Sequence, residues 1–314
     1  MPNNQIRALT QGAIMLALFL VLFAIAMYIP LLMVPAFLIA PLPIAWYSAN
    51  FERKQAILVG VLGVFSGFLM GGLLGPFLAL ILVASGIVIG DGIREKKSKL
   101  YVFLTTGVAV LLTFALLFVI MTKLFNVNFI TEGLELLEEA YTESAKIVAE
   151  QTGGEFPMER LTETFTYMEM MVPSSITLSV FLFSFMMVSI AYTLFNRLGM
   201  AVQKFGKFSS LRMPKAILWY YLIVLTVNLF VQPEHGSNLE MVMLNFSVVL
   251  WVLLTIQGVS LLFYAIEAFN YPKLLKVLAV LISFPMYSLV LLIGIIDLGF
   301  NIREYIDGKS QGRS

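Results

Sequence analysis

The stretch that decides the fold runs from Leu9 to Met33 and reads LTQGAIMLALFLVLFAIAMYIPLLM. It contains no charged residue, and a helix of about 20 apolar residues is long enough to cross the hydrocarbon core of a bilayer. A secretory signal peptide would be followed by a small-residue cleavage site and a soluble domain, whereas further apolar stretches follow here. The stretch therefore predicts a membrane-spanning helix near the N-terminus.

The same apolar pattern recurs along the 314-residue chain. Hydrophobic residues make up 60% of it and charged residues 12%, against about 25% charged residues in soluble domains. We therefore expect an all-α, polytopic transmembrane bundle of eight or nine spans. Prolines in the second span favour a broken or re-entrant segment, whose backbone must be buried in protein. The expected spans are 9–31, 34–49, 55–75, 77–93, 100–125, 173–196, 216–232, 239–268 and 277–300.

Basic residues predict the orientation of these spans, because short cytoplasmic loops are enriched in Lys and Arg. Clusters of basic residues fall at every second connection, which places the N-terminus, with Arg7, in the cytoplasm. An odd number of spans would put the C-terminus outside, whereas the basic residues of the tail favour the inside. The clusters are Arg53-Lys54; Arg94, Lys96, Lys97 and Lys99; Arg197, Lys204, Lys207, Arg212 and Lys215; and Lys273 with Lys276.

The segment 126–172 is the largest connection expected on the outside, and it contains ten glutamates. Apolar residues recur in it at helical spacing in two runs, which Gly153-Gly154 and Pro157 separate. We expect an outward helical hairpin whose apolar stripes pack together or lie on the membrane surface. It is either a solvated acidic cap or a lid over a binding site.

Composition excludes several classes of site. A net charge of +1 gives no indication of a nucleic-acid partner, and the absence of cysteine excludes disulfides and thiolate sites. One histidine, His235, cannot form a histidine-rich metal cluster. The chain has no phosphate-binding loop, zinc-protease motif or serine elbow. We therefore expect no enzyme activity, no catalytic residues, no metal, no cofactor and no ATP hydrolysis by the chain itself.

Small residues line two of the expected helices. The third span carries glycines four residues apart, which let another helix approach closely or let a ligand reach backbone amides at its outer end. In the first span, Ala13 and Ala17 form a smooth patch on which a partner helix could dock. The glycines are Gly60, Gly63, Gly67, Gly71, Gly72 and Gly75, with Gly86 and Gly90 in the next span.

Polar residues inside apolar spans are functional candidates by default. Glu267 and Asp297 lie near basic residues at the ends of their spans, so ion pairs at the membrane interface are expected, with a proton or cation relay as the alternative. Asn245 and Gln257 are expected to form hydrogen bonds between helices. Asp91 is expected to form a surface salt bridge, or to contact a cytoplasmic partner.

The first 200 residues resemble the membrane-embedded substrate-binding subunit, or S component, of energy-coupling factor transporters. The chain as a whole looks most like the YybS-like proteins, a bacterial membrane family of unknown function related to those subunits. The resemblance rests on Arg7-Ala-Leu-Thr10, Ala13 and Ala17, the proline-rich turn Val34 to Pro43, Gly71-Gly72, Gly75-Pro76, Gly86, Gly90 and the end Gly294 to Arg303.

The resemblance implies an S-component-like core at 1–200, with 126–172 as an acidic helical insertion. A cytoplasmic basic loop at 201–215 and additional helices at 216–314 would follow, in a protein of the bacterial cytoplasmic membrane. It also implies that Ala13 and Ala17 dock on a transmembrane coupling protein that carries ATPase subunits.

Two functions compete at this stage. The first is binding or transport of a small solute, without an ATPase of its own. Its ligand would sit near the outer ends of the spans, where Tyr28, Trp46, Gly71, Gly72, Gly75 and Asn128 are candidate contacts. The second is a membrane scaffold or regulatory partner with no small-molecule ligand, which would recruit proteins or anionic lipids through the basic loop.

Overall fold

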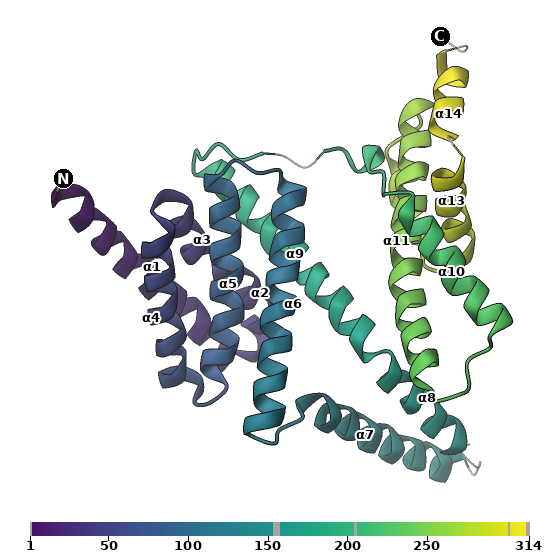
Figure 1. Cartoon of the computed structure of the whole chain (residues 1–314), viewed down its shortest axis with the longest axis horizontal. Helices are drawn as coiled ribbons and strands as arrows, with labels where there is room; N and C mark the ends of the chain where they lie inside the picture. Colours follow the sequence, from purple (N-terminus) through teal and green to yellow (C-terminus); the bar gives the residue numbers. More distant parts are fainter. Residues whose placement is uncertain (1, 153–157, 204–205, 301, 312–314) are drawn as a thin grey trace. The chain divides into compact units, whose positions relative to one another are not determined.

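The computed structural model describes residues 2–152, 158–203, 206–300 and 302–311, and every regular element in these ranges is a helix. The prediction of an all-α fold is therefore confirmed. The contacts divide the chain into two units (Figure 1). Unit 1 comprises Met1–Gly133 and Thr177–Phe205, and unit 2 comprises Leu134–Ile176 and Gly206–Ser314.

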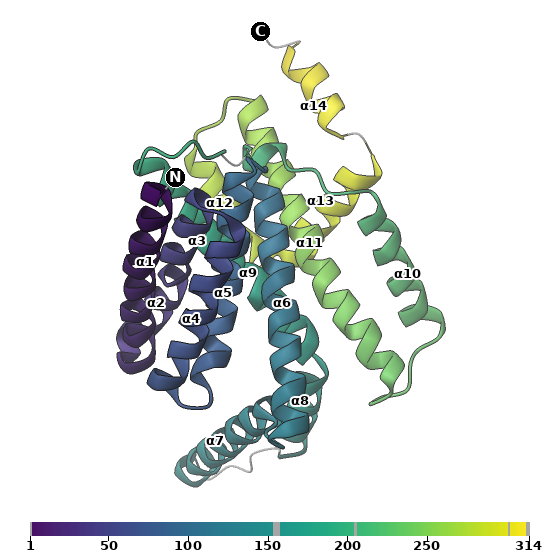
Figure 2. The ribbon, with the colours of Figure 1, turned by 60° about the vertical axis from the view of Figure 1, so that its left-hand side comes forward.

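Unit 1 contains both long and short helices (Figures 1 and 2). They are α1 (Pro2–Tyr28), α2 (Met33–Ile39), α3 (Pro41–Asn50), α4 (Arg53–Gly71), α5 (Gly75–Arg94), α6 (Lys99–Leu124) and most of α9 (Val172–Arg197), with the 3-10 helix η1 (Pro30–Leu32) before α2.

Unit 2 contains most of α7 (Phe129–Thr152), followed by shorter and longer helices. They are α8 (Met158–Met170), η2 (Phe208–Ser210), α10 (Ala216–Phe230), α11 (Asn238–Ala268), α12 (Leu274–Ser283), α13 (Tyr287–Gly299) and α14 (Ile302–Gln311).

Seven helical segments of the described chain are long and apolar enough to span a membrane, and an eighth arises if α12 and α13 count as one span. A ninth would require α10, whose 15 residues reach about 22 Å, less than the roughly 30 Å of a hydrocarbon core. The prediction of one straight span at 277–300 is wrong, because α12 and α13 meet there at a bend of 110°. Pro285 lies in this break, where it cannot donate the backbone hydrogen bond that a continuous helix needs.

Large apolar side chains cover the outside of both units. Leu69 is 78% exposed, Phe65 is 70% exposed and Phe230 is 78% exposed. Monomeric proteins in water seldom expose contiguous apolar surface on this scale, whereas lipid tails solvate it well. The exposed surface and the span lengths together make this a multi-pass membrane protein.

The core of unit 1 lies around α3 and α5. Ile44 and Ala45 of α3 are fully buried, because two glycines of α5 allow the helices to touch. A Cβ atom on Gly90 would lie 2.3 Å from the carbonyl oxygen of Ala45, and one on Gly86 would lie 2.8 Å from that of Pro41. The expected packing role of these glycines is therefore confirmed.

The expected broken span at 34–49 is continuous in the structure, since Pro30–Asn50 qualifies as one span. Pro41 and Pro43 occupy the first turn of α3, where a helix tolerates proline because its first amides have no intrahelical acceptor. Ala40, between α2 and α3, keeps helical dihedral angles. The prolines therefore mark a junction in this span without turning it back on itself.

In unit 2, α13 packs on α11 through another pair of glycines. A Cβ atom on Gly258 would lie 2.0 Å from the carbonyl oxygen of Val290, and one on Gly294 would lie 2.0 Å from that of Leu254. Neither position accepts a side chain without moving backbone.

The acidic segment forms the two expected helices, α7 and α8. The rings of Tyr141 and Phe165 meet edge to face with centroids 5.9 Å apart, so the two apolar stripes pack together. Gly153, Gly154 and Pro157 lie outside the described residues, as does Lys204 of the basic loop.

Candidate functional site

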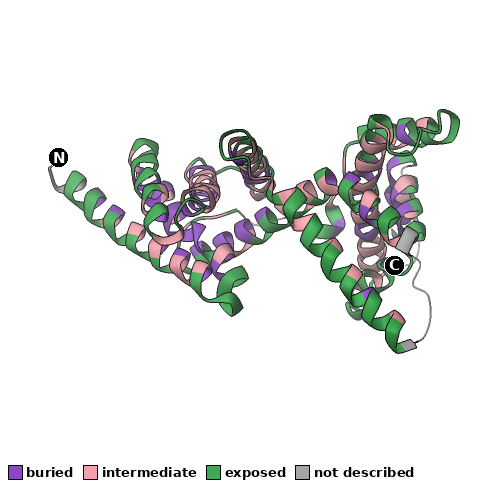
Figure 3. Cartoon of the chain, turned by 90° about the horizontal axis from the view of Figure 1, so that it is seen from below, coloured by how far each residue is buried: buried purple, intermediate pink, exposed green. Residues whose placement is uncertain are grey.

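The alanine patch of α1 lies on the exposed side of the helix. Both Ala13 and Ala17 are exposed, and in Figure 3 the helix that begins at the N-terminus carries exposed and half-buried residues over most of its length. Phe19 and Phe23, both fully buried, form the face that packs into unit 1. The two alanines therefore take no part in the core of unit 1 and are available to a neighbour in the membrane.

Three of the candidate ligand residues meet where α1 and α4 end. The Tyr28 hydroxyl donates a hydrogen bond to the carbonyl of Met70, and a Cβ atom on Gly71 would lie 3.1 Å from Met27 Cε. Gly72 adopts a φ of +55° and has open space around it. Tyr28 is 65% exposed, so these residues form an accessible corner at one end of unit 1.

The other three candidates contact different residues. Gly75 is buried, and a Cβ atom on it would lie 1.9 Å from the carbonyl oxygen of Gly67, so helix packing accounts for this glycine. Trp46 packs its ring near that of Phe51, with centroids 6.5 Å apart. At about 1.5 Å per residue, the helical path from Pro30 to Trp46 spans roughly 24 Å, which separates Trp46 from the corner at Tyr28.

Asn128 has a local structural role. Its side-chain oxygen accepts a hydrogen bond of 3.3 Å from the Thr131 amide, as an N-cap residue does at the start of a helix. The structure therefore brings together Tyr28, Gly71 and Gly72. The contacts of Trp46, Gly75 and Asn128 are with other residues, although Gly75 lies only three positions after Gly72 in the chain.

Asp91 connects neighbouring helices at the opposite end of unit 1. Its carboxylate accepts hydrogen bonds from Ser48 and Arg94, each of 2.7 Å, and pairs with Arg53 at 3.0 Å. Arg94 also donates to the carbonyls of Ser48 and Phe51. The expected salt bridge is present, but Asp91 is only 9% exposed, so it links α3, α4 and α5 from within.

The basic connections of unit 1 lie at this end. Arg53 reaches Asp91, and the Gln203 amide donates a 3.0 Å hydrogen bond to the carbonyl of Lys96. The loop after α3, the loop after α5 and the segment after α9 are thus neighbours, as expected for connections on one side of a membrane.

Unit 2 contains a buried ion pair between Asp297 and Arg303. Their side chains are 0% and 5% exposed, and the Arg303 Nη2 atom lies 2.7 Å from the Asp297 carboxylate. The predicted pairing is confirmed, and the pair is buried inside unit 2. Gln257 of α11 also donates to this carboxylate, and its side-chain oxygen accepts from the Met213 amide at 2.9 Å.

Arg303 has further partners that sequence reasoning missed. Its guanidinium donates to the carbonyls of Ser209 and Leu211 at 2.7 Å and 3.0 Å, and to the Ser260 hydroxyl at 3.2 Å. No sequence signal connects these residues, because Ser209 lies 94 positions from Arg303. Ser209 and Leu211 of the expected basic loop are therefore anchored to Arg303 in the core of unit 2.

The remaining polar residues of α11 behave as expected. Lys276 pairs with Glu267, which also accepts a hydrogen bond from Ser209. The Asn245 side chain accepts from the Ser174 amide and donates to the carbonyl of Met170, each at 2.7 Å. These contacts confirm the predicted ion pair and the predicted hydrogen bonds between helices.

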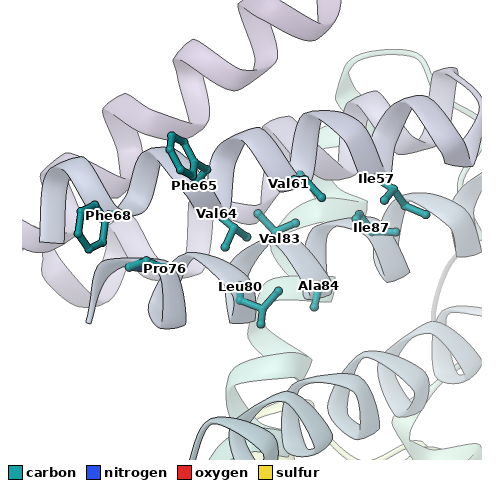
Figure 4. A pocket seen from close by; sticks show the side chains of 11 residues that line it. Ile57, Val61, Val64, Phe65, Phe68, Pro76, Leu80, Val83, Ala84 and Ile87 are labelled. Atoms are coloured by element: carbon teal, nitrogen blue, oxygen red, sulfur yellow. The ribbon is translucent and has the colours of Figure 1, made fainter. Parts of the chain in front are cut away.

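An open groove of about 680 Å³ lies on unit 1. Figure 4 shows Val61, Val64 and Phe65 of α4 on one side, with Leu80 and Val83 of α5 on the other. All of its lining residues are apolar, so the groove suits a hydrocarbon chain better than a polar solute.

Comparisons with known proteins agree on the family. The model of a family described as "Predicted membrane protein (DUF2232)" matches residues 17–298. The chain is similar to the uncharacterized protein YybS of Bacillus subtilis (strain 168), with 26% identity over 310 residues that cover 96% of this chain and 99% of that protein. No solved structure matches. The chain therefore belongs to the DUF2232 family of predicted membrane proteins.

Proposed function

We propose that the chain is a non-catalytic binding subunit of a bacterial membrane complex, and that α1 docks on a second membrane protein. The exposed pair Ala13 and Ala17 carries this proposal. Small residues on a lipid-facing surface let the backbone of a partner helix come close, and such contacts drive helix association inside membranes. Ile14 and Leu18, 50% and 46% exposed, flank the pair and supply apolar contact area beside it.

The more specific form of the proposal is small-solute binding or transport, with ATP hydrolysis supplied by a partner. It follows from the resemblance to energy-coupling factor S components. The corner at Tyr28, Gly71 and Gly72 supports it, because an exposed aromatic side chain and open backbone lie together there. In this form the N-terminus is cytoplasmic and the corner faces outward, which agrees with the basic connections at the opposite end of unit 1.

A second candidate is a scaffold or regulatory partner with no small-molecule ligand. One observation favours it: Gly75 and Asn128 of the expected ligand set have packing and capping roles instead. Both candidates share the docking face of α1.

The test is copurification of the full-length tagged chain from its native membrane. The variant Ala13→Leu/Ala17→Leu is compared with wild type, and Ala115→Leu serves as the matched control because Ala115 is an exposed alanine of α6. Two leucines would hold a partner helix away from the α1 backbone, so we expect recovery of the partner to fall by about tenfold or more.

Equal recovery with the double variant and the wild type would refute docking through α1. If docking holds, the nature of the partner separates the two candidates. An ATPase module among the lost proteins supports transport, and a partner set without one supports the scaffold.

A further inference from the structure

A cavity of about 240 Å³ with charged and polar residues in its lining lies in unit 1 where α6 begins and α9 ends. Unlike the apolar groove, it combines two cationic side chains with neutral polar ones. Its polar lining comes from Lys99, Tyr192, Thr193, Asn196, Arg197 and Gln203.

Tyr192 is the buried member of this lining. It is 3% exposed, and its hydroxyl has no hydrogen-bond partner among the described residues. Buried hydroxyl groups in proteins are nearly always hydrogen-bonded, so an unpartnered one calls for an explanation. The Lys99 ammonium lies 5.4 Å from the centroid of the Tyr192 ring, and both residues line the cavity.

The surroundings favour an anion. Lys99 is the first residue of α6, and the positive end of a helix dipole attracts negative charge. The carbonyl groups at the C-terminal end of α9 carry partial negative charge, which opposes an anion. This effect is reduced because the amides of Gly199 and Met200 donate hydrogen bonds to the carbonyls of Asn196 and Phe195. The preceding loop adds the charge of Lys96, whereas Lys97 pairs with the carboxylate of Glu95 at 3.7 Å.

Both helices qualify as membrane spans, so their adjoining ends lie at the level of lipid headgroups. A phosphate group fits this place and this chemistry, since it is anionic and accepts several hydrogen bonds. We propose that the cavity binds a phosphate group, held by the charges of Lys99 and Arg197 and by a hydrogen bond from the Tyr192 hydroxyl. The phosphate belongs either to an anionic phospholipid or to a soluble compound.

The test is thermal unfolding of the purified full chain in detergent with two probes at constant ionic strength. One probe is short-chain phosphatidylglycerol and the other is inorganic phosphate. Lys99→Gln and Arg197→Gln should each weaken the apparent affinity by about five- to tenfold, since each removes a charge-assisted contact. Tyr192→Phe removes one hydrogen bond and should weaken it by about threefold.

Lys97→Gln is the matched control, because it removes one charge from the same loop outside the cavity and should change the affinity by less than about twofold. The unfolding temperature of each variant without probe shows whether it folds, and Tyr192→Phe keeps the aromatic ring in the core. If phosphatidylglycerol alone stabilises the chain, the ligand is a lipid headgroup. If inorganic phosphate competes with phosphatidylglycerol for the cavity, the ligand is a soluble phosphate compound. The proposal is overturned if neither probe stabilises the chain, or if Lys97→Gln weakens binding as much as Lys99→Gln.

Discussion

Replacing Arg303 by methionine should destabilise unit 2 by about 3–5 kcal/mol, which is the usual cost of removing one partner from a buried ion pair. The two side chains are 5% and 0% exposed, so water cannot solvate the carboxylate of Asp297 that remains. Of its described hydrogen bonds, the one from Gln257 would persist. The carbonyls of Ser209 and Leu211 would also lose the donors that Arg303 provides.

A double variant separates the charge effect from the packing effect. Asp297→Leu/Arg303→Met removes both charges, and apolar replacements of a buried pair are often tolerated. The orphaned carbonyls still cost about 1–3 kcal/mol. The double variant should therefore be more stable than Arg303→Met alone.

The assay is equilibrium unfolding of the full chain in mixed SDS and mild detergent, followed by tryptophan fluorescence. Trp219 and Trp251 lie in unit 2, whereas Trp46 lies in unit 1. Lys276→Met is the control, because the Glu267–Lys276 pair is partly exposed, at 35% and 23% of its side chains. Such a pair contributes at most about 1 kcal/mol.

Two results would refute this reasoning. One is an Arg303→Met variant that loses no more stability than Lys276→Met. The other is a double variant that is less stable than the Arg303→Met single variant.

Three further predictions follow from the packing and the charge pattern. Gly75→Ala should destabilise unit 1 by about 1–3 kcal/mol, because its methyl group would collide with the Gly67 carbonyl. The control Gly133→Ala adds a methyl group at an open helical position, and it should be neutral or stabilising in the same unfolding assay. In this cysteine-free chain, single cysteines at Lys97 and Glu132 should react with a membrane-impermeant thiol reagent from opposite sides of the membrane, and labelling from one side would contradict the proposed orientation. Deleting about residues 130–170 should leave the protein in the membrane fraction while altering solute uptake; unchanged uptake would exclude a lid role for the hairpin.

Helix positions could be predicted because apolar length is a local property of the sequence. The spans expected at 100–125, 173–196 and 239–268 correspond closely to α6, α9 and α11. The bend after α12 could not be predicted, because Pro285 indicates only that the helix breaks. Its 110° angle depends on how the flanking helices pack.

Contacts between distant residues were the harder part of the site. The pairing of Asp297 with Arg303 could be predicted from their six-residue separation, but its burial depends on η2 and α11 closing over it. The separation of Trp46 from Tyr28 could be predicted from the sequence, because Tyr28 lies just before the second span and Trp46 lies toward its far end. The cavity beside Tyr192 could not be predicted, because its lining comes from two helices and a following segment.

In the proposed function, α1 contacts another membrane protein through its alanine face. The most direct measurement is site-specific photo-crosslinking in native membranes, with the reactive residue at position 17 and a control at position 115, both exposed alanines. We expect a crosslinked product with a second membrane protein from position 17 and none from position 115. A product of equal yield from both positions, or none from position 17, would contradict it.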